Sequence, residues 1–204
     1  MRYETDSCAT PRRRPRRVAG LLPVVLAVLL ASAPPGARAA TGGFEIEVNK
    51  SARLLIVRAG AEVLKTFRVA VGRGGRGDKS MRGDNKTPIG TYRVVGYNDR
   101  SRFDTFVRLN YPNVKDAYYG LRNAVISRYE FDRIVAALRQ GRTPPQNTAL
   151  GGAIGIHGIG EETPEKVRIH DHLDWTEGCI ALRNADIQEL KRFLTLGTRV
   201  VIRE

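Results

Sequence analysis

Short stretches in which apolar and polar residues alternate, or in which a few apolar residues follow one another, recur after residue 43. Alternation with a period of two is typical of a strand with one buried face. Turn-forming Gly, Asn and Lys residues separate the stretches. The pattern therefore predicts mostly antiparallel strands at Phe44–Val48, Leu54–Val57, Thr66–Val71, Tyr92–Val95 and Arg199–Ile202.

Two other segments have the period of a helix. The first opens with a capping box at Ser127–Glu130, in which the serine oxygen accepts a free backbone N–H and the glutamate reaches back to the cap. Its apolar residues fall on one face, and Gly141 follows its end. The second is expected to begin with Asn184 as N-cap and to stop before Gly197. The whole pattern predicts a mostly β fold with two or more helices.

The first forty residues differ from the rest. A cationic block precedes the apolar run Val18–Leu30, and small residues follow, with Ala37–Ala39 as an A-x-A-like cleavage site. This order is typical of a secretory signal peptide. The alternative is a membrane anchor, but the run contains Pro23 and is shorter than the roughly 20 residues that span a bilayer. We expect residues 1–40 to be a signal peptide, residues 41–204 to form one domain without a membrane span, and the product to be exported to the periplasm or cell wall.

Charge and cysteine content follow from that division. The chain has a net charge of +13, and residues 1–40 carry seven of its arginines and two acidic residues, so the remainder is about +8. An exported basic protein is expected to meet acidic wall polymers and carboxylate-rich peptidoglycan, and no nucleic acid. Cys8 lies in the signal peptide, so Cys179 is left as a lone thiol. A lone thiol is either reactive or a small buried hydrophobe.

A glycine-rich run, Gly72–Gly77, matches the dinucleotide-binding pattern G-x-G-x-x-G. That fingerprint requires a helix directly after it, so that the pyrophosphate sits at the helix N-terminus. Turn-forming residues follow instead. We therefore expect a flexible loop and no bound dinucleotide.

The segment 151–184 contains the candidate chemistry. An apolar strand leads to His157, and Cys179 follows Gly178. A histidine base within hydrogen-bond reach activates a thiol, so a thiolate is expected to persist at mildly acidic pH. The backbone N–H groups of Gly178 and Cys179 are candidates for an oxyanion site. A metal site is the competing interpretation, but zinc-type spacings are missing, and we predict no metal and no cofactor. The candidate ligands of such a metal site would be His157, His170, His172, Asp174 and Cys179.

These motifs resemble the L,D-transpeptidase catalytic-domain family (YkuD type). The resemblance rests on His157-Gly158, on Thr176-Glu177-Gly178-Cys179, on the turn Thr87–Tyr92, and on the endings Asn184–Asp186 and Gly197–Ile202. It implies a β-sandwich-like fold and acyl transfer on peptidoglycan stem peptides, with release of a terminal D-Ala. It assigns Cys179 as nucleophile, His157 as base, the Gly158 carbonyl as the group that orients the imidazole, and Thr176 as a residue lining the site.

Three features depart from the family pattern. His157 and Cys179 are 22 residues apart, Glu177 stands where many members have histidine, and Ala181 replaces a frequent arginine. The phrase from Asp174 to Leu182 resembles a subgroup with hydrolytic members that cleave a wall-attached lipoprotein from peptidoglycan. Hydrolysis by an amidase or carboxypeptidase therefore stays open beside transfer, as does a non-catalytic basic wall-binding domain. Trp175, His172 and Arg183 are candidates for substrate binding.

Overall fold

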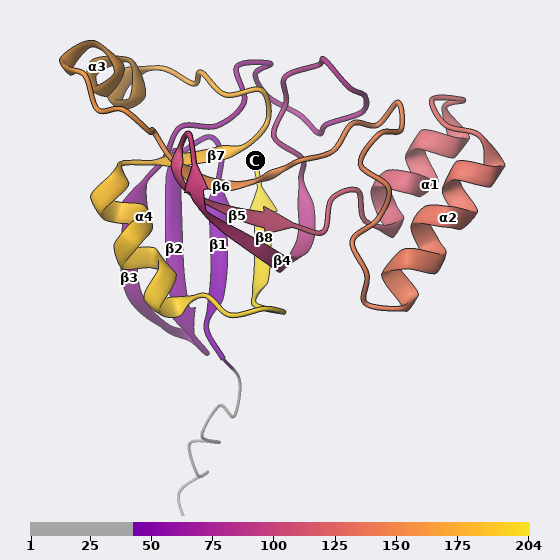
Figure 1. Cartoon of the computed structure of the whole chain (residues 1–204), viewed down its shortest axis with the longest axis horizontal. Helices are drawn as coiled ribbons and strands as arrows, with labels where there is room; N and C mark the ends of the chain where they lie inside the picture. Colours follow the sequence, from indigo (N-terminus) through magenta and orange to yellow (C-terminus); the bar gives the residue numbers. More distant parts are fainter. Residues whose placement is uncertain (1–42) are drawn as a thin grey trace, which may run out of the picture. The chain divides into compact units, whose positions relative to one another are not determined.

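The computed structural model describes residues 43–204, and the expected signal peptide at 1–40 lies outside the described residues. Eight strands form one sheet in the order β3-β2-β1-β8-β4-β5-β6-β7 (Figure 1). Two neighbouring pairs, β1–β8 and β6–β7, are parallel, and the other pairs are antiparallel. The strands are β1 (Glu45–Asn49), β2 (Leu54–Ala59), β3 (Glu62–Arg68), β4 (Gly90–Ser101), β5 (Asp104–Leu109), β6 (Gly155–Gly158), β7 (Ile180–Leu182) and β8 (Arg199–Arg203).

The long strand β4 joins the two halves of the sheet. Its first part, Gly90–Arg93, pairs with β8, and its later part, Val94–Ser101, pairs with β5 through two register shifts. Shifts of this kind bend a strand and increase its twist. Apolar side chains from both halves then meet in one core, represented by Val57 in β2, Leu109 in β5 and Ile156 in β6. The expected mostly β, sandwich-like fold is confirmed.

Four α-helices accompany the sheet: α1 (Val114–Arg122), α2 (Arg128–Arg139), α3 (Pro164–His172) and α4 (Asn184–Leu190), the last followed by a 3₁₀ turn, η1 (Lys191–Phe193). The capping box predicted for α2 is present, with Ser127 and Glu130 in reciprocal hydrogen bonds. The helices α1 and α3 were not predicted. Their signals were nevertheless in the sequence, since Asn113 and Asp116 form a second capping box and Thr163 caps α3 just before Pro164.

Two boundary predictions were wrong for identifiable reasons. The strand expected over Thr66–Val71 ends at Arg68. The next residues no longer pair with β2, and Ala70 instead exchanges backbone hydrogen bonds with Ala181 of β7. Asn184 is the first residue of α4 and not its cap. Its side chain instead bonds both backbone groups of Gly160, at 3.1 and 2.6 Å.

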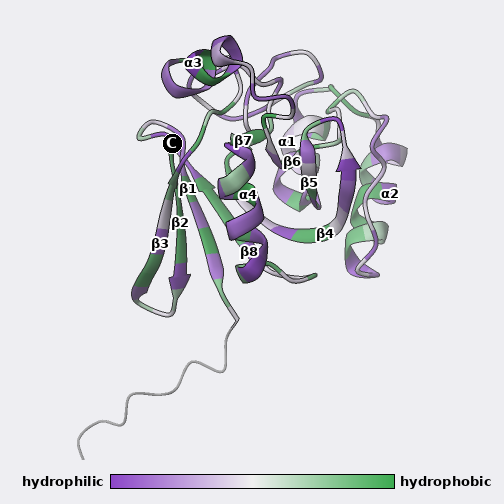
Figure 2. Cartoon of the chain, turned by 60° about the vertical axis from the view of Figure 1, so that its left-hand side comes forward, coloured by the Kyte–Doolittle hydropathy of each residue, from purple (hydrophilic) through white to green (hydrophobic). Residues whose placement is uncertain are grey.

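The helices α1 and α2 pack side by side at one end of the sheet, away from α4 (Figure 1). They enclose a second, smaller apolar cluster of Ala117, Ile126, Ile134 and Leu150. In Figure 2 hydrophobic and hydrophilic residues alternate along β1, in keeping with the period of two seen in the sequence, whereas β2 opens with the apolar run Leu54–Val57. Within residues 43–204, no helix has the length and apolar character needed to cross a bilayer.

Candidate active site

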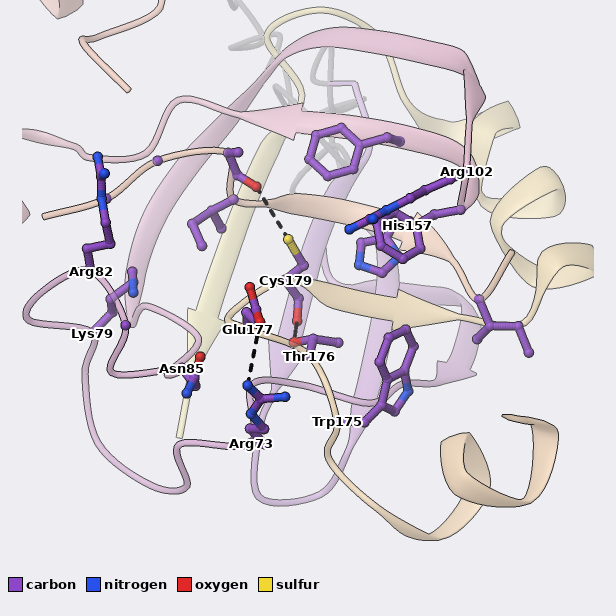
Figure 3. Close-up of a pocket in the computed structure, with 18 of the residues that line it drawn as sticks. Arg73, Lys79, Arg82, Asn85, Arg102, His157, Trp175, Thr176, Glu177 and Cys179 are labelled. Carbon is purple, nitrogen blue, oxygen red and sulfur yellow. Dashed lines mark hydrogen bonds and ion pairs between the residues drawn. The ribbon is translucent and has the colours of Figure 1, made fainter. Parts of the chain in front are cut away.

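The two sequence-predicted reactive residues come from neighbouring strands. His157 lies in β6, and Cys179 immediately precedes β7, which pairs in parallel with β6 through Ile156 and Ile180. The 21 residues between them, including α3, form an excursion that leaves β6 and returns beside it. Both side chains line a pocket of about 1480 Å³ (Figure 3). Parallel pairing thus brings together residues that the sequence keeps apart.

The His157 ring is oriented by its own neighbour. Its Nδ1 lies 2.6 Å from the Gly158 carbonyl oxygen. A carbonyl oxygen only accepts, so Nδ1 carries the proton in this contact. In the neutral ring the lone pair is then on Nε2, the nitrogen that a general base needs. The expected orienting contact from Gly158 is therefore present in the structure.

Aromatic side chains enclose the imidazole, which is only 2% exposed. Phe103 stacks on it with ring centroids 4.4 Å apart, and Phe106 and Trp175 each lie at 6.0 Å. We call Phe103, Phe106 and Trp175 the aromatic wall. Burial lowers the pKa of His157 to about 4, against the opposing Gly158 hydrogen bond and with a smaller contribution from Arg102. The ring is therefore a neutral base at any pH above about 5.

The Cys179 thiol is also held in its neutral form. Burial raises its pKa to about 11, although the Gly155 N–H and the charge of Lys79 act in the opposite direction. Its Sγ lies 3.4 Å from the Ala153 carbonyl oxygen, to which a thiol donates. The raised pKa of Cys179 therefore does not support the predicted thiolate at mildly acidic pH. The thiol and the imidazole that line this pocket are therefore both neutral at rest.

Thr176 shapes the turn that carries the cysteine. Its buried hydroxyl donates to the Cys179 carbonyl at 2.7 Å and accepts the Gly178 N–H at 3.2 Å. The Gly178 N–H is therefore engaged, contrary to the expectation that it points at an oxyanion. The N–H of Cys179 has no partner among residues 43–204. One of the two expected oxyanion donors is thus left.

Gly178 is required by the backbone at this turn. Its φ is +127°, and an added Cβ would lie 2.7 Å from the Lys86 carbonyl oxygen. Side chains rarely adopt that φ, and no Cβ tolerates that approach. The cysteine turn therefore rests directly on the segment that leads into Thr87-Pro88.

The glycine-rich run is packed rather than loose. An added Cβ on Gly72 would lie 2.2 Å from the Asn85 carbonyl oxygen, and one on Gly74 would lie 2.0 Å from that of Asp84. The Gly72 N–H donates to the buried Thr87 hydroxyl at 2.8 Å. The glycines of the G-x-G-x-x-G match thus allow two arms of one loop to lie in contact. The run is a loop without a following helix, as predicted, and its Gly72 and Gly74 are held in close backbone contact.

This loop supplies the side of the pocket opposite the aromatic wall. The sequence did not indicate that any pocket-lining residue of this loop belongs to the site. We call these residues the loop wall. Figure 3 shows Arg82, Lys79 and Asn85 on one side of Cys179, with His157, Arg102 and Trp175 on the other. The loop wall consists of Arg73, Lys79, Arg82, Gly83 and Asn85.

The three residues proposed for substrate binding have different positions. Trp175 lines the pocket. Arg183 does not, because its guanidinium pairs with Asp171 at 2.7 Å. His172 is exposed on α3, outside the pocket lining, and its Nδ1 lies 2.9 Å from the Arg168 carbonyl oxygen of the same helix. Arg102 does line the pocket, and it was missed because it lies in the tight turn between β4 and β5 and matches no motif.

The residues considered for a metal do not converge. His170 and His172 lie on α3 rather than on a strand, and two positions apart on a helix they do not share a face. His170 is buried and accepts a 3.4 Å hydrogen bond from the Trp175 indole. Within residues 43–204, no three His, Cys, Asp or Glu side chains are grouped as metal ligands would be.

The comparisons with known proteins point to one family. The model of the YkuD family, described as the L,D-transpeptidase catalytic domain, matches residues 43–202. The helical cell shape determining protein Pgp2 from Campylobacter jejuni is 22% identical with a TM-score of 0.51, over 79% of this chain and 48% of that one. An L,D-transpeptidase from Xylanimonas cellulosilytica is 15% identical with a TM-score of 0.45, over 79% and 61%.

This chain spans about half the length of the first of these structures, and at such identities the likeness concerns the fold alone. No curated protein matches the chain. The family match, by contrast, covers nearly the whole described region and includes both His157 and Cys179. The chain therefore belongs to the L,D-transpeptidase catalytic-domain family.

Proposed function

We propose that this protein is a cysteine acyltransferase acting on peptidoglycan stem peptides, with Cys179 as nucleophile and His157 as general base. The family to which it belongs acts on peptidoglycan. One observation carries the assignment of the two residues. His157 donates through Nδ1 to Gly158, so its lone pair is on Nε2, and the ring lines the same pocket as the Cys179 sulfur. These two features support the roles of nucleophile, base and orienting group for Cys179, His157 and Gly158.

The neutral resting pair defines the order of proton movements. As the sulfur bonds to the scissile carbonyl carbon, the thiol proton passes to Nε2 of His157. The intermediate then collapses, the carbon–nitrogen bond breaks, and the same proton passes to the leaving amine. A thioester on Cys179 remains. An incoming amine or water attacks it, gives its proton to Nε2, and the thiol recovers that proton on departure.

The oxyanion of each intermediate needs a donor near the sulfur. The Cys179 backbone N–H is the proposed donor, since Thr176 engages its neighbour and fixes the turn. A hydrogen bond from this N–H to the oxyanion would be stronger in the pocket, beside apolar groups, than it is in water. His157 then takes the thiol proton while this donor stabilises the negative charge that develops on the carbonyl oxygen.

The pocket also suits an acidic peptide. Of its charged lining residues, five are basic and two are acidic. Peptidoglycan stems carry several carboxylates, so the charge balance supports them as substrates. The proposal includes export to the wall compartment, because residues 1–40 have the pattern of a signal peptide.

Transfer is favoured over hydrolysis by the excursion between β6 and β7. Ile159, Glu161, Lys166 and Ile169 from this segment line the pocket. A covered acceptor side helps an amine to be held close to the thioester and to compete with water. Hydrolysis of a stem, or of its link to a wall-attached lipoprotein, remains the second candidate because of the resemblance around Cys179.

The test uses a disaccharide-tetrapeptide, alone and with an excess of a D-amino acid, followed by mass spectrometry of the products. Exchange of the terminal D-Ala, or formation of a dimer, supports transfer. Tripeptide alone indicates hydrolysis. The Cys179→Ala protein is the control for both. Unchanged substrate in every mixture, together with retention on purified sacculi, would favour the non-catalytic wall-binding alternative.

A further inference from the structure

The pocket contains five basic side chains, but most of them are already engaged. Three form ion pairs with carboxylates, and Arg82 donates to the Thr148 carbonyl at 3.0 Å. Arg102 alone among the five has neither an ion pair nor a side-chain hydrogen bond within residues 43–204. Its contact is with the Phe103 ring. The paired residues are Arg73 with Glu177 at 3.5 Å, Lys79 with Asp84 at 2.7 Å and Lys166 with Glu161 at 3.8 Å.

The position of Arg102 is set by close backbone packing. An added Cβ on Gly160 would lie 2.4 Å from the Arg102 carbonyl oxygen, and one on Gly158 would lie 2.7 Å from that of Phe103. Gln188 of α4 also donates to Asp104 at 2.7 Å. The turn between β4 and β5 is thus pressed onto the strand that carries His157. Such support makes a side chain suitable for recognition, because little backbone order has to be gained on binding.

The guanidinium lies on the histidine side of the pocket. Its Cζ is 4.7 Å from the centroid of the Phe103 ring, and that ring stacks on His157 at 4.4 Å. Figure 3 shows the Arg102 side chain reaching from the turn towards the space beside the Cys179 sulfur, with Arg82 on the opposite side. The charge of Arg102 also lowers the pKa of His157, which agrees with this proximity.

The chemistry decides which part of a substrate lies there. His157 returns its proton to the leaving amine, so the leaving residue must lie on the His157 side of the scissile carbonyl. In a terminal amino acid the carboxylate carbon is about 2.5 Å from that amine nitrogen. An unpaired guanidinium on the same side is well placed for a carboxylate, which it binds in a bidentate manner.

We propose that Arg102 is a specificity-determining residue that binds the terminal carboxylate of the leaving amino acid. The inference rests on the proposed function and identifies the substrate group that the site recognises. The enzyme then selects stems that end one residue after the scissile bond. An extra residue moves the terminal carboxylate more than 3 Å farther along an extended chain, and a terminal carboxamide removes its charge.

The experiment compares two tetrapeptide stems that differ only at the end, one with a free carboxylate and one with a carboxamide. Release of the terminal residue is followed by mass spectrometry with wild type, Arg102→Gln and Arg100→Gln. Arg100 is exposed on the same hairpin and does not line the pocket, so its variant is the matched control. We expect wild type and Arg100→Gln to prefer the free carboxylate by about tenfold to a hundredfold in kcat/KM. Arg102→Gln should lose that preference, because only the stem with the free carboxylate should react more slowly.

Each other outcome has a definite meaning. A general structural defect in Arg102→Gln would slow both substrates equally and leave the preference intact, which would overturn the inference while the proposed function stands. Equal reaction of both substrates with wild type would overturn it in the same way. If wild type forms no thioester on Cys179 and releases nothing from either substrate, the proposed function and the inference both fail.

Discussion

The aromatic wall and the loop wall enclose the same sulfur by different physical means. The aromatic wall uses side chains, since Phe103, Phe106 and Trp175 exclude water from His157 and keep it neutral. The loop that carries the loop wall is held by backbone contacts, since Gly72 and Gly74 allow its two arms to touch. The aromatic wall thus tunes the His157 imidazole, and the loop that carries the loop wall supports the turn that carries the thiol. Substitutions on the two sides should therefore fail in different ways.

The largest effect is expected for His157→Gln. The variant would lack the proposed proton acceptor, so kcat should fall by about 100- to 10,000-fold. The melting temperature should change little by comparison, because glutamine has a similar size. Turnover of the tetrapeptide stem measures the first quantity and calorimetry the second. Activity within a factor of three of wild type would remove His157 from the mechanism.

The contact between the cysteine turn and this loop is tested by Gly178→Ala. The new Cβ would meet the Lys86 carbonyl oxygen at a φ of +127°, so the fold should lose about 1–3 kcal/mol of stability. Gly43→Ala is the control, since nothing lies within 4 Å of its added Cβ. Denaturant unfolding of both variants gives the comparison. Equal stability of the two variants would mean that the cysteine turn is not held by this contact.

The sequence predicted the strands whose period was clear and the capped helix α2, because those patterns depend on neighbours along the chain. It also indicated His157 and Cys179, because both stand in short motifs. It did not reveal Phe103 or Arg102, which reach the site only after β4 and β5 fold back onto β6. The glycine-rich loop was visible, but the close backbone packing at Gly72 and Gly74 was not predicted, since close approach and flexibility both favour glycine. Residues that meet only through tertiary packing produce no periodic pattern in the local sequence.

The aromatic wall is tested by Phe103→Leu. A smaller side chain admits water to His157, so the pKa of that residue should rise from about 4 towards its usual value of 6.5. The lowered pKa keeps the base neutral above about pH 5, and the variant should lose activity as pH falls through 6. At pH 8 the rates should agree within a few fold. An acid limb that does not move in the pH profile of kcat/KM would show that these rings do not control the base.

The smallest effect is expected for Glu177→Gln. The Arg73–Glu177 pair spans 3.5 Å with both side chains largely exposed, so its loss should alter stability by no more than about 0.5 kcal/mol. Glu177 raises the pKa of Cys179, and its removal should make alkylation by iodoacetamide slightly faster at pH 8. A large loss of activity would instead identify Glu177 as part of the chemistry.

The most direct measurement is the mass of the intact protein, residues 41–204, shortly after mixing with a disaccharide-tetrapeptide. Wild type should gain the mass of the substrate less its terminal residue and one water, and peptide mapping should find the label on Cys179. His157→Gln should accumulate far less of this species, and Cys179→Ala none. An unlabelled wild-type protein that still turns over substrate, or the same label on Cys179→Ala, would contradict the central claim that Cys179 carries the acyl group.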